Sequence, residues 1–188
     1  MSGEKRAGEE RAGAGLAGMK DAMERVNRIW FHPFYQECLR KIRAHEAERE
    51  FCRHTPEHFL DVARLTYILA LEADCLPSQP LERAAVRERV YAAGLLHDIG
   101  RWRQYEEGIP HEQASAEAAE GILSDCSFSG EEQEAVLSLI RNHRTKQEGT
   151  SLEALFYRAD KLSRSCFSCP AREKCDWSEE KKNLEIRL

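Results

Sequence analysis

Apolar residues recur along most of this chain at the spacing of an α-helix, with polar residues between them. We therefore predict helices at most positions from Met19 onwards. The His32-Pro33 step predicts that one helix ends near Phe31 and the next begins at the proline, because proline disfavours α geometry in the residue before it. Thr55-Pro56 predicts a capped helix start, and that helix continues to about Asp74.

The segments between these helices hold the polar residues and helix breakers expected of loops. Residues 76–80 and 101–110 are predicted loops, and the charged run 45–50 is predicted to be a solvent-exposed continuation of a helix. No stretch alternates apolar and polar residues as a half-buried strand does, and Ala, Leu, Glu and Arg are abundant. The fold is thus predicted to be all-α.

The length of 188 residues and the hydrophobic share of 41% suit one core. We expect a leader over residues 1–18, which holds almost nothing to bury and should be disordered, followed by one helical domain over residues 19–165. Residues 166–188 contain three of the seven cysteines. They are expected to form a tail packed on or near that domain.

A formal charge of −5 and the lack of a long basic block argue against general nucleic-acid or membrane-surface binding. No apolar run approaches the ~18 residues that a membrane-spanning helix needs, and the first residues lack the apolar core of a signal peptide. An odd number of cysteines suits thiol or metal chemistry better than a secreted disulfide framework. We therefore expect a cytoplasmic protein.

Five of the predicted helices carry a histidine or an aspartate on the apolar stripe that should face the core. The stripes are His58 with Val62, Leu65 and Leu69; Val86, Val90, Ala93 and Gly94 with His97, and Asp98 one step round; His111 with Ser115, Ala118 and Ile122; Val136 and Ile140 with His143; and Leu152 and Phe156 with Asp160. A single histidine of this kind is usually a hydrogen-bonded core residue. Each such group would cost about 1 to 3 kcal/mol if it were buried unpaired, and a shared divalent cation offsets that cost for all of them. Imidazole and carboxylate ligands suit Mn, Fe, Co, Ni or Zn.

The order His58, His97-Asp98, Asp160, with the segments Leu-Leu-His-Asp-Ile-Gly and Ala-Asp-Lys-Leu, resembles the HD-domain metal-dependent phosphohydrolase superfamily, whose defining pattern is a helical H…HD…D. The resemblance runs from about His58 to Arg164. It implies that one divalent ion is held by His58, His97, Asp98 and Asp160, with Asp98 bridging to a second ion. His111 and His143 resemble the additional histidines by which some branches bind that second ion.

Two branches of the superfamily fit poorly. Ile99-Gly-Arg-Trp-Arg stands where the alarmone hydrolases have an acidic pair. His143 is followed by Arg144, without the paired histidines and the Gly-Tyr-Pro element of the cyclic-di-GMP branch. The single His111 and His143 resemble most the small bacterial HD hydrolases, which include enzymes that split dinucleoside tetraphosphates. The identity of the substrate, and whether one or two ions bind, stay open.

A metal pair acidifies water enough to supply hydroxide near neutral pH and neutralises the phosphate oxygens under attack, so phosphate esters or anhydrides are the expected substrates. Cations flank the candidate ligands although the whole chain is acidic: Arg101, Arg103, Arg144, Lys146, Arg158, Lys161 and Arg164. Arg101 and Lys161 lie within three residues of candidate ligands. We place them with Asp98 in the candidate catalytic set, for phosphate binding or leaving-group stabilisation.

Three cysteines near the C-terminus, Cys166, Cys169 and Cys175, have a C-x2-C-x5-C spacing that suits a zinc ion or an iron–sulfur cluster with one more ligand. Cys52 is the candidate for that ligand, because it precedes His58 by as many residues as Cys166 follows Asp160. If those two helices meet antiparallel at the metal, both cysteines are displaced about 9 Å in the same direction. Free thiols, or a Cys166/Cys169 redox pair, are the alternative.

The sequence thus predicts an HD-type hydrolase acting on a small phosphorylated molecule, with a nucleotide as the expected substrate. The choice among phosphomonoesterase, phosphodiesterase and pyrophosphohydrolase stays open. One alternative is a non-catalytic metal-binding sensor or ligand-binding module whose cysteines respond to redox state. The other is a structural helical domain whose histidines are ordinary core residues.

Overall fold

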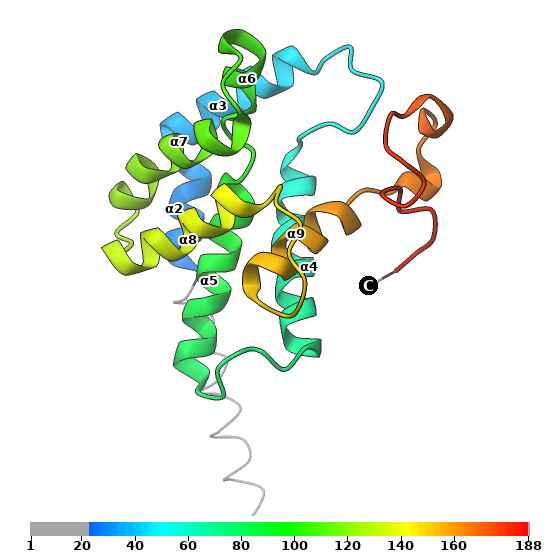
Figure 1. Ribbon diagram of the computed structural model, residues 1–188. Helices are drawn as coiled ribbons and strands as arrows, with labels where there is room; N and C mark the ends of the chain where they lie inside the picture. Colours follow the sequence, from blue (N-terminus) through cyan, green and yellow to red (C-terminus); the bar gives the residue numbers. More distant parts are fainter. Residues whose placement is uncertain (1–22, 188) are drawn as a thin grey trace, which may run out of the picture.

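The computed structural model describes residues 23–187, so the predicted disordered leader over residues 1–18 lies outside the described residues. The described chain folds into helices without strands, which confirms the all-α prediction (Figure 1). The helices are α2 (Glu24–Phe31), α3 (Pro33–His45), α4 (Pro56–Glu72), α5 (Pro80–Leu96), α6 (Arg101–Glu107), α7 (His111–Asp125), α8 (Gly130–Asn142) and α9 (Leu152–Leu162), followed by two 3-10 turns, η1 (Cys166–Ser168) and η2 (Arg172–Lys174).

Local side-chain chemistry sets the helix starts. The Thr55 side chain accepts the backbone N–H of His58, and Pro56 occupies the first turn of α4, as predicted. Ser129 and Glu132 form a capping box at the start of α8. The break between α2 and α3 at His32 is also confirmed.

Residues 101–107 form the helix α6, so the prediction of a loop over residues 101–110 is wrong for most of that segment. The sequence Arg-Trp-Arg-Gln-Tyr-Glu-Glu contains no helix breaker, and the helix ends where Gly108 adopts a φ of 72°. The ammonium group of Lys41 lies 3.4 Å from the ring centroid of Trp102. This contact holds α6 against α3.

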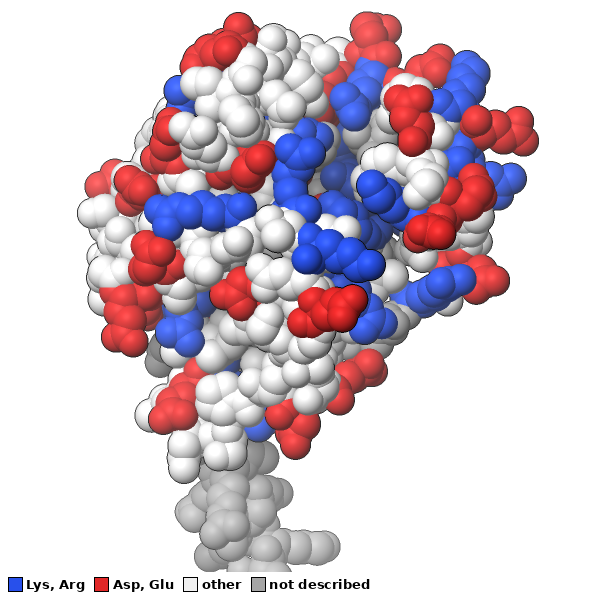
Figure 2. Space-filling model, in the orientation of Figure 1, with Lys and Arg blue, Asp and Glu red and all other residues white. Residues whose placement is uncertain are grey.

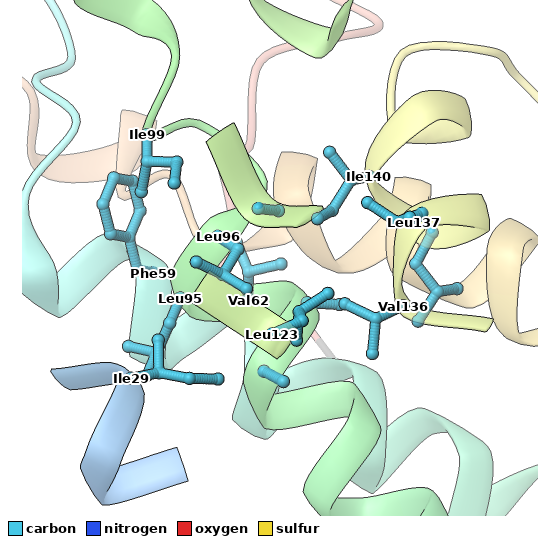
Figure 3. Packing of buried hydrophobic residues seen from close by; sticks show 14 of the residues in the cluster. Ile29, Phe59, Val62, Leu95, Leu96, Ile99, Leu123, Val136, Leu137 and Ile140 are labelled. Atoms are coloured by element: carbon cyan, nitrogen blue, oxygen red, sulfur yellow. The ribbon is translucent and has the colours of Figure 1, made fainter. Parts of the chain in front are cut away.

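Helix α5 lies at the centre of the fold and packs against α2, α4, α7 and α8. Its last turns are made of small and apolar residues, and Leu95 and Leu96 are fully buried. Figure 3 shows these two leucines lying near Phe59 and Val62 of α4 and near Ile29 of α2. The chain therefore leaves α5, just before His97 and Asp98, inside the core and not at the surface.

Two glycines allow the close approaches that fix this exit point. A Cβ at position 94 would lie 2.6 Å from the Cβ of Ala63 and 2.9 Å from the carbonyl oxygen of Phe59, so the backbones of α5 and α4 touch there. A Cβ at position 100 would lie 2.3 Å from the backbone nitrogen of Ser115, and the N–H of Gly100 donates to the hydroxyl of Ser115 at 2.9 Å. His97 and Asp98 are thus held between α4 and α7.

After α9, residues 165–187 form a small lobe to one side of the helical body, close to the loop that joins α3 to α4 (Figure 1). Asn183 ties this lobe together. Its side-chain Nδ2 donates to the backbone carbonyl oxygens of Leu162 (3.0 Å) and Arg164 (3.2 Å), and its backbone carbonyl oxygen accepts the N–H of Phe167 (2.9 Å).

Candidate metal centre

The residues predicted as metal ligands converge at one end of the helical body. They come from the first turn of α4, the residues directly after α5, the first residue of α7, the residue directly after α8 and the last turns of α9: His58, His97, Asp98, His111, His143 and Asp160. All six are buried. They fall into two groups, one of His58, His97 and Asp160 and the other of Asp98, His111 and His143, and within each group the ligand atoms lie within 4.8 Å of one another.

The carboxylate of Asp98 joins the two groups. Its Oδ2 lies 3.3 Å from Nε2 of His97 and 3.7 Å from Nε2 of His58. Its Oδ1 lies 3.3 Å from Nε2 of His111 and 3.7 Å from Nε2 of His143. Each carboxylate oxygen therefore faces one group, which is the arrangement of a carboxylate shared between two sites.

Hydrogen bonds at Nδ1 hold the histidine rings in the orientation a metal requires. Nδ1 of His97 donates to the carbonyl oxygen of Gly94 at 2.8 Å, and Nδ1 of His143 donates to that of Ile140 at 2.6 Å. Nδ1 of His58 lies 2.9 Å from the hydroxyl of Ser163. With the proton on Nδ1, the Nε2 lone pairs of His97 and His143 face Asp98 and are available to a cation. Nε2 of His58 accepts a hydrogen bond from Arg164 at 2.9 Å, which a bound metal would replace.

Burial keeps most of these imidazoles neutral, that of His143 among them, but at His97 it is outweighed by Asp98, which raises the pKa of that ring. Loss of hydration is the main cause that lowers the pKa of His58 and of His111 to about 3. Burial would also raise the pKa of Asp98, but the imidazoles of His97 and His54 hold it well below its usual value. At neutral pH His58, His111 and His143 thus offer neutral nitrogen donors around the ionised carboxylate of Asp98, the protonation states in which these groups bind metals.

Two buried atoms at the centre have no hydrogen-bond partner among the described residues: Nε2 of His97 and Oδ1 of Asp98. A buried polar atom without a partner costs about 1 to 3 kcal/mol. A divalent cation in each of the two groups would satisfy these atoms, and nitrogen and oxygen donors of this kind suit such ions. The residues present therefore fit a divalent metal site.

A seventh group, His54, also faces Asp98 and was missed by the sequence analysis. Its Nε2 lies 3.5 Å from Oδ2 of Asp98, while its Nδ1 is hydrogen-bonded to Glu46. Tyr105 donates its hydroxyl proton to the same carboxylate at 2.6 Å. Glu46 is 3% exposed, so the prediction that residues 45–50 continue a solvated helix is wrong: α3 ends at His45, and the chain turns back to bury this carboxylate. The sequence held one signal for His54: it directly precedes Thr55, the residue that caps α4, and so lies close to His58.

A pocket of about 390 Å³ opens above Asp98 and Asp160. Its cationic lining residues are Arg49, Arg101, Arg144, Lys161, Arg164 and Lys181, and three aromatic rings join them, those of Phe51, Tyr157 and Trp177. Figure 2 shows lysines and arginines gathered around the hollow on this face. The pocket is therefore a cationic site within a chain of net charge −5.

Of the cations singled out in the sequence, Arg101, Arg144, Lys161 and Arg164 line this pocket. Arg103 is paired instead with Glu107 and Glu117, and neither Lys146 nor Arg158 belongs to the described lining. Arg49 and Lys181 were missed, because they reach the pocket from the α3–α4 loop and from the C-terminal lobe. Helical periodicity carries no signal for side chains on such segments.

Arg101 is tied into the centre. Its guanidinium donates to Nε2 of His54 at 3.0 and 3.2 Å, and its Nη1 lies 2.7 Å from Nδ1 of His111. Lys161 pairs with Asp160. Burial raises the pKa of that carboxylate, but Lys161 and the neighbouring histidines lower it by more, so its pKa lies below the usual value. The ammonium group of Lys161 also lies over the rings of Tyr157 and Trp177, at 5.1 and 5.7 Å from their centroids.

The cysteines proposed as ligands, Cys52, Cys166, Cys169 and Cys175, are all free of disulfide bonds. Two of them, Cys52 and Cys175, line the pocket just described. No three of their sulfurs belong to a group as compact as the two His/Asp groups of the described chain.

The described helices include none that is both long and apolar enough to cross a lipid bilayer. In comparisons with known proteins, the family model of the HD domain matches residues 55–165. A protein of Clostridium beijerinckii, named only as an uncharacterized protein, is 39% identical over 164 residues, which cover 87% of this chain and 99% of that protein. No solved structure matches the chain.

Proposed function

This chain belongs to the HD domain family of metal-dependent phosphohydrolases, and from that premise we propose that it hydrolyses a phosphate ester or anhydride of a nucleotide. The observation that carries the proposal is the position of Asp98, whose two carboxylate oxygens face two separate groups of ligands at the floor of a cationic pocket.

In this proposal His58, His97, Asp98 and Asp160 hold one divalent ion, and Asp98, His111 and His143 hold a second. Bound divalent ions supply Lewis-acid polarisation of phosphoryl oxygens and acidify water. The chain's own part is to fix the donors. The carbonyl oxygens of Gly94 and Ile140 set the rings of His97 and His143, and burial excludes the water that would compete for these atoms.

The pocket lining supports a phosphorylated substrate. Arg101 and Lys161 place positive charge beside the ligand groups, where they can bind phosphate oxygens or stabilise a leaving group. Arg144 is positioned at the same rim and is paired with Glu112 at 3.3 Å. These cations sit where negative charge of a substrate would need to be neutralised.

A nucleotide is favoured over a simple sugar phosphate because aromatic rings accompany the cations. The Lys161 ammonium group lies over the rings of Tyr157 and Trp177, and aromatic rings of this kind suit stacking on a base. The pocket volume of about 390 Å³ falls within the range of small-ligand sites. Trp177→Ala should therefore raise KM for nucleotides more than it lowers kcat.

The test is phosphate release from a panel of nucleoside mono-, di- and triphosphates, cyclic nucleotides and dinucleoside polyphosphates in the presence of Mn2+. Asp98→Ala should reduce release to background while leaving helix content unchanged. Asp61→Ala is the matched control, since Asp61 is an exposed carboxylate on α4 that pairs only with Arg64 in the described chain, and it should keep full activity. Near-normal turnover by Asp98→Ala would refute the assignment.

His111→Ala and His143→Ala separate the second ligand group from a purely structural role. Each should lower the rate and the bound metal while the protein stays folded. If either variant unfolds with no change in metal content, that histidine is a core residue. Nucleotide binding without any hydrolysis across the panel would instead identify the chain as a ligand-binding sensor.

A further inference from the structure

The C-terminal lobe of residues 165–187 is ordered with very little apolar burial. Its longest helical elements are the three-residue turns η1 and η2. The buried apolar residues in it are Cys166 and Ala171. Ordering a backbone costs about 1 to 2 kcal/mol per residue, and small segments without a core usually need a disulfide or a metal to offset that cost. None of the cysteines is in a disulfide.

Three cysteines sit at the turns of this lobe. Cys166 opens η1, and the N–H of Cys169 donates back to its carbonyl oxygen at 3.2 Å. Cys175 follows η2, and its N–H donates to the carbonyl oxygen of Arg172 at 3.3 Å. The two turns pack against each other. The lobe is thus folded around the segment that carries these thiols.

The fourth cysteine, Cys52, is brought to the lobe by contacts on both sides of it in the sequence. The guanidinium of Arg164 donates to the carbonyl oxygen of Arg53 at 2.9 Å. The ammonium group of Lys174 lies 3.3 Å from Glu50. Cys52, between Glu50 and Arg53 in the sequence, is therefore held on the part of the α3–α4 loop that lies next to the lobe.

The fold places the four thiols in one region. Cys52 and Cys175 line the same pocket, Cys166 and Cys169 stand at the two ends of η1, and η1 packs against η2, which ends directly before Cys175. Cationic groups accompany the set. Arg164 is 8% exposed, and the side chain of Lys182, also 8% exposed, interacts with Cys175. Four thiolates bound to a metal would need such positive charge nearby.

Four cysteines commonly bind either a zinc ion or an iron–sulfur cluster, and the two require different distances between the sulfurs. Sulfurs around one tetrahedral zinc at about 2.3 Å lie about 3.8 Å from one another. Such a set would appear as a group with ligand atoms within 4.8 Å, and in the described chain only the two His/Asp groups do so. Ligands of an iron–sulfur cluster stand farther apart, because they bind different irons.

We propose that Cys52, Cys166, Cys169 and Cys175 ligate an iron–sulfur cluster that fastens the C-terminal lobe to the α3–α4 loop. Cys52 and Cys175 line the pocket above Asp98, so the cluster forms part of the pocket wall. The lobe it holds also supplies Trp177 and Lys181 to that wall. The proposal concerns a second metal site, distinct from the His/Asp centre, and does not depend on hydrolytic activity.

The test is iron and acid-labile sulfide analysis of the full chain, purified anaerobically and also after reconstitution with Fe2+ and sulfide. Sulfide reports the cluster alone, because iron bound by the His/Asp centre carries none. The wild-type chain should contain sulfide and show the visible absorption of an iron–sulfur protein. Cys169→Ser should lose both, and Cys75→Ser, which changes an exposed cysteine outside the lobe, should keep both.

The proposal is overturned if the chain takes up no sulfide on reconstitution, if Cys169→Ser keeps its sulfide, or if the wild-type chain holds about one zinc without sulfide that Cys169→Ser loses. Loss of folding is monitored separately. Helix content and Mn2+ binding at the His/Asp centre should be unchanged in Cys169→Ser, whereas proteolytic cleavage within residues 165–187 should become faster. If cleavage of the lobe is equally fast with and without sulfide in the wild-type chain, the cluster does not fasten it.

Discussion

Replacing Gly94 by alanine should damage the metal centre although the side chain added is a single methyl group. The new Cβ would lie 2.6 Å from the Cβ of Ala63 and 2.9 Å from the carbonyl oxygen of Phe59. Carbon atoms in contact stand about 3.5 to 4.0 Å apart, so α4 and α5 must separate by about 1 Å. One neighbour is backbone and cannot rotate away.

The cost follows from that separation. Overpacking of this size costs about 1 to 3 kcal/mol, and the better helix propensity of alanine returns up to about 1 kcal/mol. A remainder of about 1 to 2 kcal/mol, the middle of the resulting range, lowers Tm by roughly 2 to 8 °C in a chain of this length. Metal binding is the sharper measure, because α4 carries His58 and α5 leads into His97. A shift of one ligand against the other should weaken Mn2+ binding by about 10- to 100-fold.

Gly121→Ala is the matched control. Gly121 lies in α7 and is exposed, and nothing stands within 4 Å of a Cβ at that position. This variant should gain about 0.5 to 1 kcal/mol of stability and bind Mn2+ as the wild-type chain does. Thermal unfolding and metal titration of both variants are the assays. A Gly94→Ala protein with wild-type Tm and wild-type Mn2+ affinity would refute the inference that backbone contact between α4 and α5 positions the ligands.

Two further predictions concern stability. Burial lowers the pKa of His58 and His111 to about 3, whereas an unfolded histidine titrates near 6.5, so the unfolded chain takes up protons first as the pH falls. The metal-free protein should therefore be most stable above about pH 6.5 and lose stability as the pH drops towards 3. Urea unfolding between about pH 7 and pH 4 measures this loss. An unfolding midpoint that does not change with pH would contradict the prediction. Arg25 donates to Glu88 at 3.1 Å and to Glu132 at 2.8 Å, joining α2 to α5 and α8, and Glu88 is buried. Arg25→Leu should cost roughly 1 to 3 kcal/mol in urea unfolding, because it leaves a buried carboxylate without its partner, and an equally stable variant would show that the pair contributes nothing.

The sequence was sufficient to predict the burial of the candidate ligands that lie on regular helices or at their ends. His58, His97, His111, His143 and Asp160 each continue an apolar stripe with helical spacing, and the structure buries all of them in one cluster. Periodicity works here because a helix rotates each residue by a fixed angle, so a polar residue on the core stripe must enter the core.

The groups that the sequence analysis missed lie on irregular backbone or depend on tertiary contacts. Glu46 looked like one more charge in a solvated run, and only its contacts with His54 and Tyr105 explain its burial. Trp177 and Lys181 reach the pocket from the C-terminal lobe, whose path no helical pattern describes. The helix α6 was missed because flanking glycines and a proline suggested a loop, although they mark its two ends.

The most direct test of the central claim follows bound metal and phosphate release in the same samples. The full chain is stripped with a chelator and titrated with Mn2+ in the presence of the best nucleotide of the panel. The account predicts no phosphate release from the stripped protein. Phosphate release should then rise with bound Mn2+ to a maximum at about two ions per chain. Release that is unaffected by stripping, or full Mn2+ binding without any hydrolysis, would contradict it.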